Sequence, residues 1–489
     1  MLIFALVLWL SSQTAHPANA QPSLKAVLRS NHQPEEIPKG QVVEKIVCAG
    51  TPDQSYALYL PANYSPKRKW PVLYAFDPGA RGQIPIERFK EAAEKYGWIV
   101  AGSNNSHNGP FQPSVDSWIA IVKDTRERFA IDDTRAYLTG FSGGARLAYY
   151  FAIRCQGCFA GVIACGAGLP AGVTPSPAFH FAIFSTVGIE DFNFAEVKTL
   201  DEALEKAGLT HRTVVFTGRH DWPPLPVAIE ALEWMELQAM KSGKRQRDAN
   251  LINSLWQTQL QQAQSLEDSK QTYDAYQIYL ALNNSFKGLK DVTAVEKKVN
   301  QLREISEVKG AIQNEQQQIK KQREIGTRID ALLAARERNS KDANPNGERS
   351  NESLDPETRL TAIFAELRKQ ADRTEDSDER RVARRVREGV FIGLIEQGNN
   401  QLQTQKRYDE AVRTFKFATE VNSERAGVFF YLAWAYAASG NKKQALRALQ
   451  AAVDKGFADP VAIEGTKAFD SIRDETQYVQ IIQALRSKG

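Results

Sequence analysis

Up to about residue 240, the chain alternates short apolar runs with longer amphipathic segments. Short apolar runs are typical of strands buried on both faces of a sheet, and amphipathic segments are typical of helices. One predicted helix covers Val115–Phe129, because Trp118 and Val122 share a face with Phe129. The alternation predicts an α/β fold, in which helices flank a mostly parallel sheet. The candidate strands are Val43–Val47, Tyr56–Leu60, Val72–Phe76, Trp98–Ala101, Ala136–Thr139, Gly161–Ala164, Phe181–Ser185 and Thr213–Phe216.

Beyond residue 240 the pattern becomes helical throughout. Gln, Lys, Glu and Arg become frequent, Gly and Pro become rare, and apolar residues recur at helical spacing. We therefore expect an α/β domain over residues 21–240 and an all-α region over 241–337. Residues 338–357 are rich in Asn, Ser, Asp and Pro, which is typical of a flexible linker. A second helical domain is expected over 358–489.

An internal repeat marks the last part of the chain. The segment 407–418 is echoed by 441–452, and Ala411 and Ala445 occupy the same place in each copy, 34 positions apart. That period and pattern resemble the tetratricopeptide repeat (TPR) family. A fainter copy begins at Thr272, within 241–337. The resemblance implies paired helices whose concave surface binds a peptide or a partner protein.

The first twenty residues resemble a signal peptide. A short apolar run is followed by small and polar residues that end in Ala18-Asn19-Ala20, a pattern that signal peptidase accepts. The apolar run Leu2–Leu10 is far shorter than the roughly 20 residues that a membrane-spanning helix needs. We therefore expect a mature chain from Gln21, without an integral membrane segment, exported to a periplasm or out of the cell.

Composition excludes several classes of function. A length of 489 residues allows two or three domains, and a net charge of +4 gives no support to nucleic-acid binding. The sequence shows no phosphate-binding loop, metal cluster or dinucleotide fingerprint, so no cofactor is expected. Three of the four cysteines, Cys155, Cys158 and Cys165, lie close together in sequence. In an oxidising compartment they allow one structural disulfide, and buried thiols are the alternative.

The strongest chemical signal is Gly140-Phe141-Ser142-Gly143-Gly144, which matches G-x-S-x-G. It lies between a predicted strand and the helical segment Ala145–Ala152. A nucleophilic serine of this kind needs a sharp strand-to-helix turn with small neighbours, so that its hydroxyl projects above the sheet. We expect Ser142 to be a nucleophile.

A nucleophilic serine also needs a base and an acid, in the chain order Ser, acid, His. Among the six histidines, His220 alone follows a predicted strand after the serine, which places it at the carboxyl edge of the sheet. The loop after Phe181–Ser185 carries Glu190 and Asp191. Asp191 is the chosen acid, with Glu190 as the alternative. Asp221 is expected to be a solvated loop carboxylate.

Two backbone N–H groups should stabilise the oxyanion that forms during acyl transfer. One is the N–H of Gly143, directly after the nucleophile. The other should come from the loop after Val72–Phe76. Because Pro78 has no N–H, Gly79 or Ala80 is the candidate.

Two segments carry a further resemblance. Residues 131–144 are similar to the nucleophile segment of secreted α/β-hydrolase esterases related to feruloyl esterases and polyhydroxybutyrate depolymerases, and 218–223 resemble their histidine loop. The likeness covers about residues 40–240. It implies an α/β-hydrolase fold and a carboxylic-ester hydrolase with the triad Ser142, Asp191 and His220. Two departures are Asp77-Pro78-Gly79, where the family has His-Gly, and the lack of a long lid insertion.

The sequence thus favours an exported serine hydrolase that cleaves a small-molecule or polymer ester, with TPR-like helices for recognition. Two alternatives stay open. A hydrolase fold without activity could act as a scaffold for protein binding by the helices. A serine peptidase would use the same machinery on amides.

Overall fold

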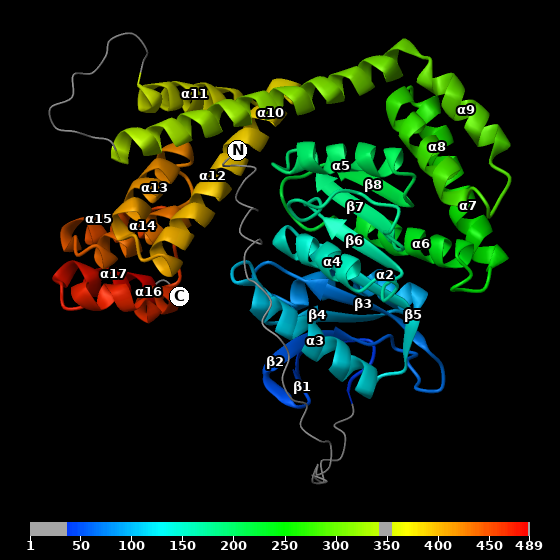
Figure 1. Ribbon diagram of the computed structural model, residues 1–489, viewed down its shortest axis with the longest axis horizontal. Helices are drawn as coiled ribbons and strands as arrows, with labels where there is room; N and C mark the ends of the chain where they lie inside the picture. The colour runs from blue at the N-terminus through cyan, green and yellow to red at the C-terminus, as the bar shows by residue number, and fades with distance from the viewer. Residues whose placement is uncertain (1–36, 342–354, 488–489) are drawn as a thin grey trace. The chain divides into compact units, whose positions relative to one another are not determined.

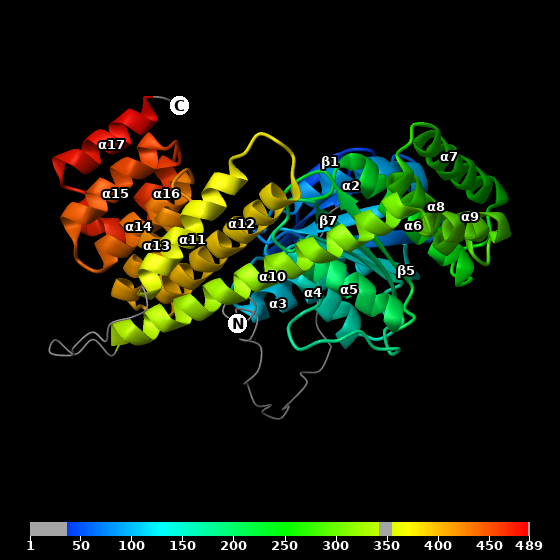
Figure 2. The ribbon, with the colours of Figure 1, turned by 90° about the horizontal axis from the view of Figure 1, so that it is seen from above.

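A computed structural model describes residues 37–341 and 355–487, so the predicted signal peptide lies outside the described residues. The described chain divides into two compact units, residues 37–319 and 320–487. The long helix α10 (Ser306–Lys341) begins in the first unit and ends in the second. It is drawn as one continuous helix in Figures 1 and 2. None of the described helices is both long and apolar enough to span a bilayer.

An eight-stranded sheet organises the first unit, in the order β1-β2-β4-β3-β5-β6-β7-β8. Within this sheet, β2 runs in the opposite direction to the other strands, so its pairs with β1 and β4 are antiparallel. The remaining neighbours, from β4 through β3, β5, β6 and β7 to β8, pair in parallel. All eight predicted strands are present. Their bounds are β1 (Val42–Cys48), β2 (Thr51–Tyr59), β3 (Trp70–Phe76), β4 (Ile99–Ser103), β5 (Ile131–Phe141), β6 (Gly161–Cys165), β7 (Ala182–Gly188) and β8 (His211–Phe216).

Helices cover both faces of this sheet (Figure 1). One face packs against α3 (Phe111–Arg128), α4 (Gly143–Arg154) and α5 (Phe194–Lys206). The other packs against α2 (Gln83–Tyr96) and α6 (Leu225–Lys241). β3, β4, β6 and β7 are buried along their whole length, because parallel strands covered on both faces have no solvent side. The predicted α/β layering is thus confirmed.

The rest of the first unit is helical. The helices α7 (Ala249–Asp268), α8 (Thr272–Phe286) and α9 (Thr293–Arg303) share an apolar core with the end of α6 and the start of α10. The predicted faint repeat falls in α8. The side chain of Asp248 accepts a hydrogen bond from the Leu251 N–H at 3.0 Å and so caps the start of α7.

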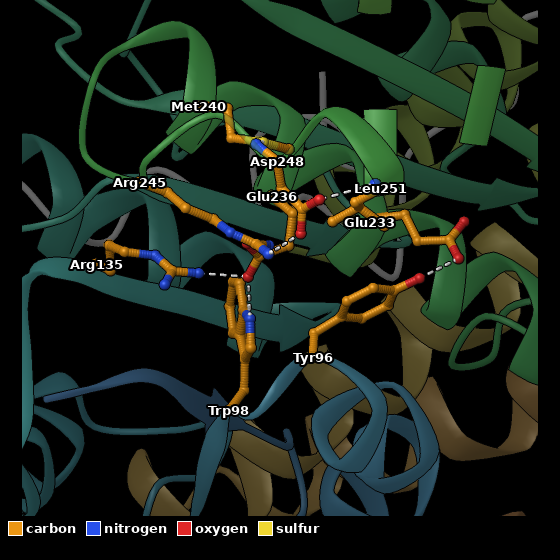
Figure 3. A network of polar contacts seen from close by, with 9 residues as sticks. All are labelled: Tyr96, Trp98, Arg135, Glu233, Glu236, Met240, Arg245, Asp248 and Leu251. Carbon is orange, nitrogen blue, oxygen red and sulfur yellow. Dashed lines mark hydrogen bonds and ion pairs between the residues drawn. The ribbon is translucent and has the colours of Figure 1, made fainter. Parts of the chain in front are cut away.

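A buried ionic network joins α6 to the amino edge of the sheet (Figure 3). Glu236 is fully buried and accepts a 2.5 Å hydrogen bond from Trp98 Nε1. Its carboxylate also pairs with Arg135 of β5 and with Arg245, which follows α6. Because Arg245 lies beyond residue 240, this network is a polar contact between the α/β layer and the segment that follows it.

The second unit, residues 320–487, holds the remaining helices around one apolar core. Within it, α13 packs against α14 and α14 against α15, as both views show (Figures 1 and 2). Ala411 and Ala445 are fully buried at corresponding places in α13 and α15. The assignment to the TPR class stays a prediction. The bounds are α11 (Pro356–Ala371), α12 (Asp378–Asn399), α13 (Tyr408–Val421), α14 (Ala426–Ala438), α15 (Lys442–Asp454), α16 (Pro460–Gly465) and α17 (Thr476–Arg486).

The ends of the predicted linker 338–357 belong to helices. α10 continues to Lys341, and α11 begins at Pro356 after the side chain of Asp355 accepts the Glu357 N–H at 2.8 Å. An aspartate cap followed by proline in the first turn is a strong helix start. Residues 342–354 of the linker lie outside the described residues.

Candidate active site

Ser142 lies on a tight turn between β5 and α4. Its backbone has φ 53° and ψ −119°, a conformation that L-residues rarely adopt. A Cβ at Gly140 would lie 2.1 Å from the carbonyl oxygen of Gly144, and a Cβ at Gly144 would lie 2.0 Å from that of Phe76. Both positions therefore require glycine. The turn has the geometry that the G-x-S-x-G pattern predicts.

His220 and Asp191 meet at the same edge, after β8 and β7. The His220 Nδ1 lies 2.9 Å from both carboxylate oxygens of Asp191. Asp191 is fully buried, and its Oδ1 also accepts the Asn193 N–H at 2.8 Å. Two acceptor oxygens facing Nδ1 hold the proton on that nitrogen, so Nε2 is left as the atom that can accept a proton.

Two aromatic rings hold the His220 imidazole. The centroid of the Phe141 ring lies 4.5 Å from that of the imidazole, and the Phe192 centroid lies 4.2 Å from it. Phe141 directly precedes Ser142, so the side chain next to the candidate nucleophile touches the candidate base. The imidazole is mostly buried, and Asp191 and the two rings together restrict its orientation.

The loop after β6 brings the three segments together. The Ser142 N–H donates to the carbonyl of Cys165 at 2.8 Å, and Gly166 follows with φ +66°. A Cβ at Gly166 would lie 3.1 Å from Asp191 Oδ2 and 3.3 Å from His220 Cε1. It would also lie 3.0 Å from the Phe141 ring. The structure thus collects the serine turn, the acid and the histidine around one glycine at the carboxyl edge of the sheet.

The neighbouring carboxylates have other partners. Glu190 lies 3.5 Å from Arg219 Nε, an ion pair beside the histidine loop. Asp221 is exposed, and its Oδ1 accepts the Trp222 N–H at 2.7 Å. Of the two acids that the sequence left open, Asp191 is the one that contacts His220.

The other two histidines that follow Ser142 lie away from this site. His180 is exposed and precedes β7. His211 opens β8 at the opposite edge, with Nε2 3.4 Å from Asp201 Oδ1. Burial opposes the charged form of His211, but the bonds to Asp201 and to the Leu209 carbonyl prevail and raise its pKa.

The predicted oxyanion donors divide into two cases. The Gly143 N–H lies in the first turn of α4, where an amide has no acceptor within its own helix. By contrast, the Gly79 N–H donates to Asp77 Oδ1 at 2.9 Å and the Ala80 N–H donates to the Asp77 carbonyl at 3.2 Å. This contradicts the expectation that Gly79 or Ala80 is held ready for an oxyanion. These amides are engaged because Asp77 forms a turn in which its side chain accepts the N–H of Gly79, two residues later in the chain.

Asp77 was not among the predicted site residues. Its carboxylate is fully buried and accepts bonds from Arg81 Nε at 2.8 Å and from Trp222 Nε1 at 3.0 Å. Trp222 lies two residues after His220, so Asp77 ties the loop after β3 to the histidine loop. The sequence shows the Asp-Pro-Gly turn around Asp77. It does not show that Trp222, far away in the chain, is a hydrogen-bond partner of this aspartate.

A parallel sheet with a serine on a strand-to-helix turn at its carboxyl edge defines the α/β-hydrolase fold. No family model matches the sequence, and no curated protein is significantly similar to it. A fluorophosphonate-binding serine hydrolase from Staphylococcus aureus aligns over 40% of this chain and 99% of its own, with 12% identity and a TM-score of 0.33.

Two esterases give similar values. A feruloyl esterase module from Clostridium thermocellum aligns over 40% of this chain and 86% of its own, with 15% identity and a TM-score of 0.32. A thermophilic esterase from Thermogutta terrifontis aligns over 44% of this chain and 99% of its own, with 15% identity and a TM-score of 0.34. At these values, no inference about substrate rests on the likeness.

Proposed function

We propose that this chain is a serine hydrolase that cleaves carboxylic esters through an acyl-enzyme intermediate. The observation that carries the proposal is the buried Asp191 carboxylate against His220 Nδ1, beside a serine on a strained turn. Mutually oriented groups of this kind are characteristic of a nucleophile and its base. The ester preference rests on the resemblance of residues 131–144 and 218–223 to secreted esterases, since amide cleavage uses the same groups.

The proposed reaction has two halves. In the first, Ser142 Oγ attacks the ester carbonyl, its proton passes to His220 Nε2, and the alcohol leaves with that proton. In the second, His220 takes a proton from water as the water oxygen attacks the acyl carbonyl. The bond between the acyl carbon and Ser142 Oγ then breaks, His220 returns the proton to Oγ, and the carboxylic acid is released. Asp191 stabilises the imidazolium in both halves without itself becoming protonated.

The test is hydrolysis of p-nitrophenyl acetate and butyrate by the full chain and by Ser142→Ala. We expect at least a roughly 10³-fold loss of kcat in the variant, because the nucleophile is removed. A loop serine, Ser176→Ala, is the control and should keep full activity. Equal turnover by the native chain and Ser142→Ala would refute the proposal and favour a binding protein that uses the fold as a scaffold.

We also propose that the second unit recognises a partner protein or a polymeric substrate and takes no part in the chemistry. The support is the 34-residue repeat and the buried alanines of α13 and α15. Removal of residues 320–489 tests this, because a cut after residue 240 would instead strip Arg245 from the buried Glu236. The activity of the truncated chain on p-nitrophenyl acetate should stay within about twofold of that of the full chain. Complete loss in a variant with native circular dichroism would refute the division of labour.

Export is a third part of the proposal. It rests on the signal-like residues 1–20 and predicts a mature amino terminus at Gln21. In the structure a disulfide joins Cys155 and Cys158, which accords with an oxidising compartment. Amino-terminal sequencing of the protein from a periplasmic or culture fraction checks it. An intact Met1 in a purely cytosolic protein would refute export.

A further inference from the structure

The further inference concerns the second oxyanion donor, and it rests on the proposed function. Acyl transfer by a serine needs at least two donors aimed at the developing oxyanion. The Gly143 N–H supplies one. The amides of Gly79 and Ala80, where the second was expected, already donate to Asp77. A different group must therefore complete the pair.

The loop that follows β4 packs against the loop after β3. The Asn108 N–H donates to the carbonyl of Pro78 at 2.9 Å, and His107 forms an antiparallel bridge with Gly79. These backbone contacts fix Asn108 without using its side chain. The Asn108 residue is exposed, at the open side of the site.

The side-chain amide of Asn108 lies directly over Gly143. A Cβ at Gly143 would lie 1.9 Å from Asn108 Oδ1 and 3.2 Å from its Nδ2. This close approach explains why glycine is needed directly after the serine. Within the described parts of the chain, no hydrogen bond engages this side-chain amide, so its donor and its acceptor are both available to a ligand.

We propose that the Asn108 side chain is the second oxyanion donor of this enzyme. Rotation of the amide by a half-turn about its Cβ–Cγ bond exchanges the positions of Oδ1 and Nδ2, which have the same shape. Nδ2–H then takes the position against Gly143 that Oδ1 now occupies, next in sequence to Ser142. In the tetrahedral intermediate the oxyanion accepts one bond from Asn108 Nδ2 and one from the Gly143 N–H. Asn108 thus replaces a backbone donor that the Asp77 turn has removed.

The test measures kcat and KM for p-nitrophenyl acetate in the full chain, Asn108→Ala and Asn108→Asp. Loss of one oxyanion donor costs about 10²- to 10³-fold in kcat, and KM should change by less than about threefold. Asn108→Asp keeps the shape but replaces the donor by a negative charge, so its kcat should fall below that of Asn108→Ala. Gln112→Ala is the matched control, since that exposed amide donates to Asp116 at 2.8 Å; it should keep full activity.

The rate of phosphonylation by a fluorophosphonate gives a second measurement, because the phosphoryl oxygen takes the place of the oxyanion. It should fall in both Asn108 variants. If the native chain hydrolyses the ester in a Ser142-dependent manner and Asn108→Ala stays within threefold of it, the Asn108 proposal alone is overturned. It is also overturned if Asn108→Asp is as active as the native chain. An inactive native chain overturns the proposed function instead.

Discussion

Replacing Asp191 by asparagine tests how the candidate triad is held together. In the structure Asp191 offers two oxygens to His220 Nδ1 at 2.9 Å, and one of them also accepts the Asn193 N–H at 2.8 Å. Asparagine has one oxygen, and the Asn193 N–H retains it. The amide Nδ2 then faces Nδ1 and donates to it, so the imidazole proton moves to Nε2 and the base for Ser142 is lost.

The size of the effect follows from this change of tautomer. Triads with the acid changed to its amide lose about 10⁴ in kcat, and we expect a loss of about 10³- to 10⁴-fold here. This corresponds to about 4–5.5 kcal/mol of transition-state stabilisation. Initial rates with p-nitrophenyl acetate, together with thermal unfolding to show that the variant is folded, provide the measurement.

Glu190→Gln is the matched control for this experiment. It removes one carboxylate at the adjacent position, but Glu190 pairs with Arg219, whose side chain is 69% exposed, at 3.5 Å. The Glu190 side chain itself is only 12% exposed, but its ion pair is with Arg219 and not with His220. Glutamine keeps the shape of the side chain, so activity should change by less than about twofold. The reasoning is refuted if Asp191→Asn keeps more than a tenth of native activity, or if Glu190→Gln loses as much as Asp191→Asn.

Three further predictions concern the surroundings of the site. Glu236→Gln leaves Arg135 and Arg245, whose side chains are 13% and 24% exposed, without their counter-charge and should lower the free energy of unfolding by about 3 kcal/mol in urea. A change under 1 kcal/mol would contradict the network's role. Gly166→Ala should reduce kcat by more than tenfold, because a Cβ at φ +66° would contact Asp191 and His220 too closely. An unchanged kcat would show that the loop shifts to accommodate the methyl group. His211→Ala should reduce the free energy of unfolding most below about pH 6.5. The pKa of His211 is raised in the folded state, so its protonation stabilises the fold at low pH, and this contribution fades as the pH rises through the folded-state pKa. A destabilisation that grows with pH would contradict this direction.

The sheet was predictable because its strands are apolar along their length. β3 and β7 are buried throughout; β3 holds only apolar and aromatic residues, and β7 has two small polar residues, Ser185 and Thr186, among apolar ones. β2 was predicted too short, since its first residues, from Thr51 onward, are polar and exposed in the hairpin with β1. Apolar patterning detects only the buried part of a strand.

The site residues could be predicted where their positions follow from chain order and from the edge of the sheet at which a strand ends. Ser142 and His220 follow strands that must end at the same edge, and this could be inferred from sequence. Whether Glu190 or Asp191 faces the histidine depends on one residue of turn geometry. The roles of Asp77 and Asn108 depend on how two loops cross, and no local pattern encodes that crossing.

Covalent labelling shows whether Ser142 is an activated nucleophile. The full chain is treated with a fluorophosphonate and analysed by intact mass and peptide mapping. We expect one equivalent of adduct on the peptide that contains Ser142, and none in Ser142→Ala. The absence of an adduct in the native chain, or an adduct that persists in Ser142→Ala, would contradict it.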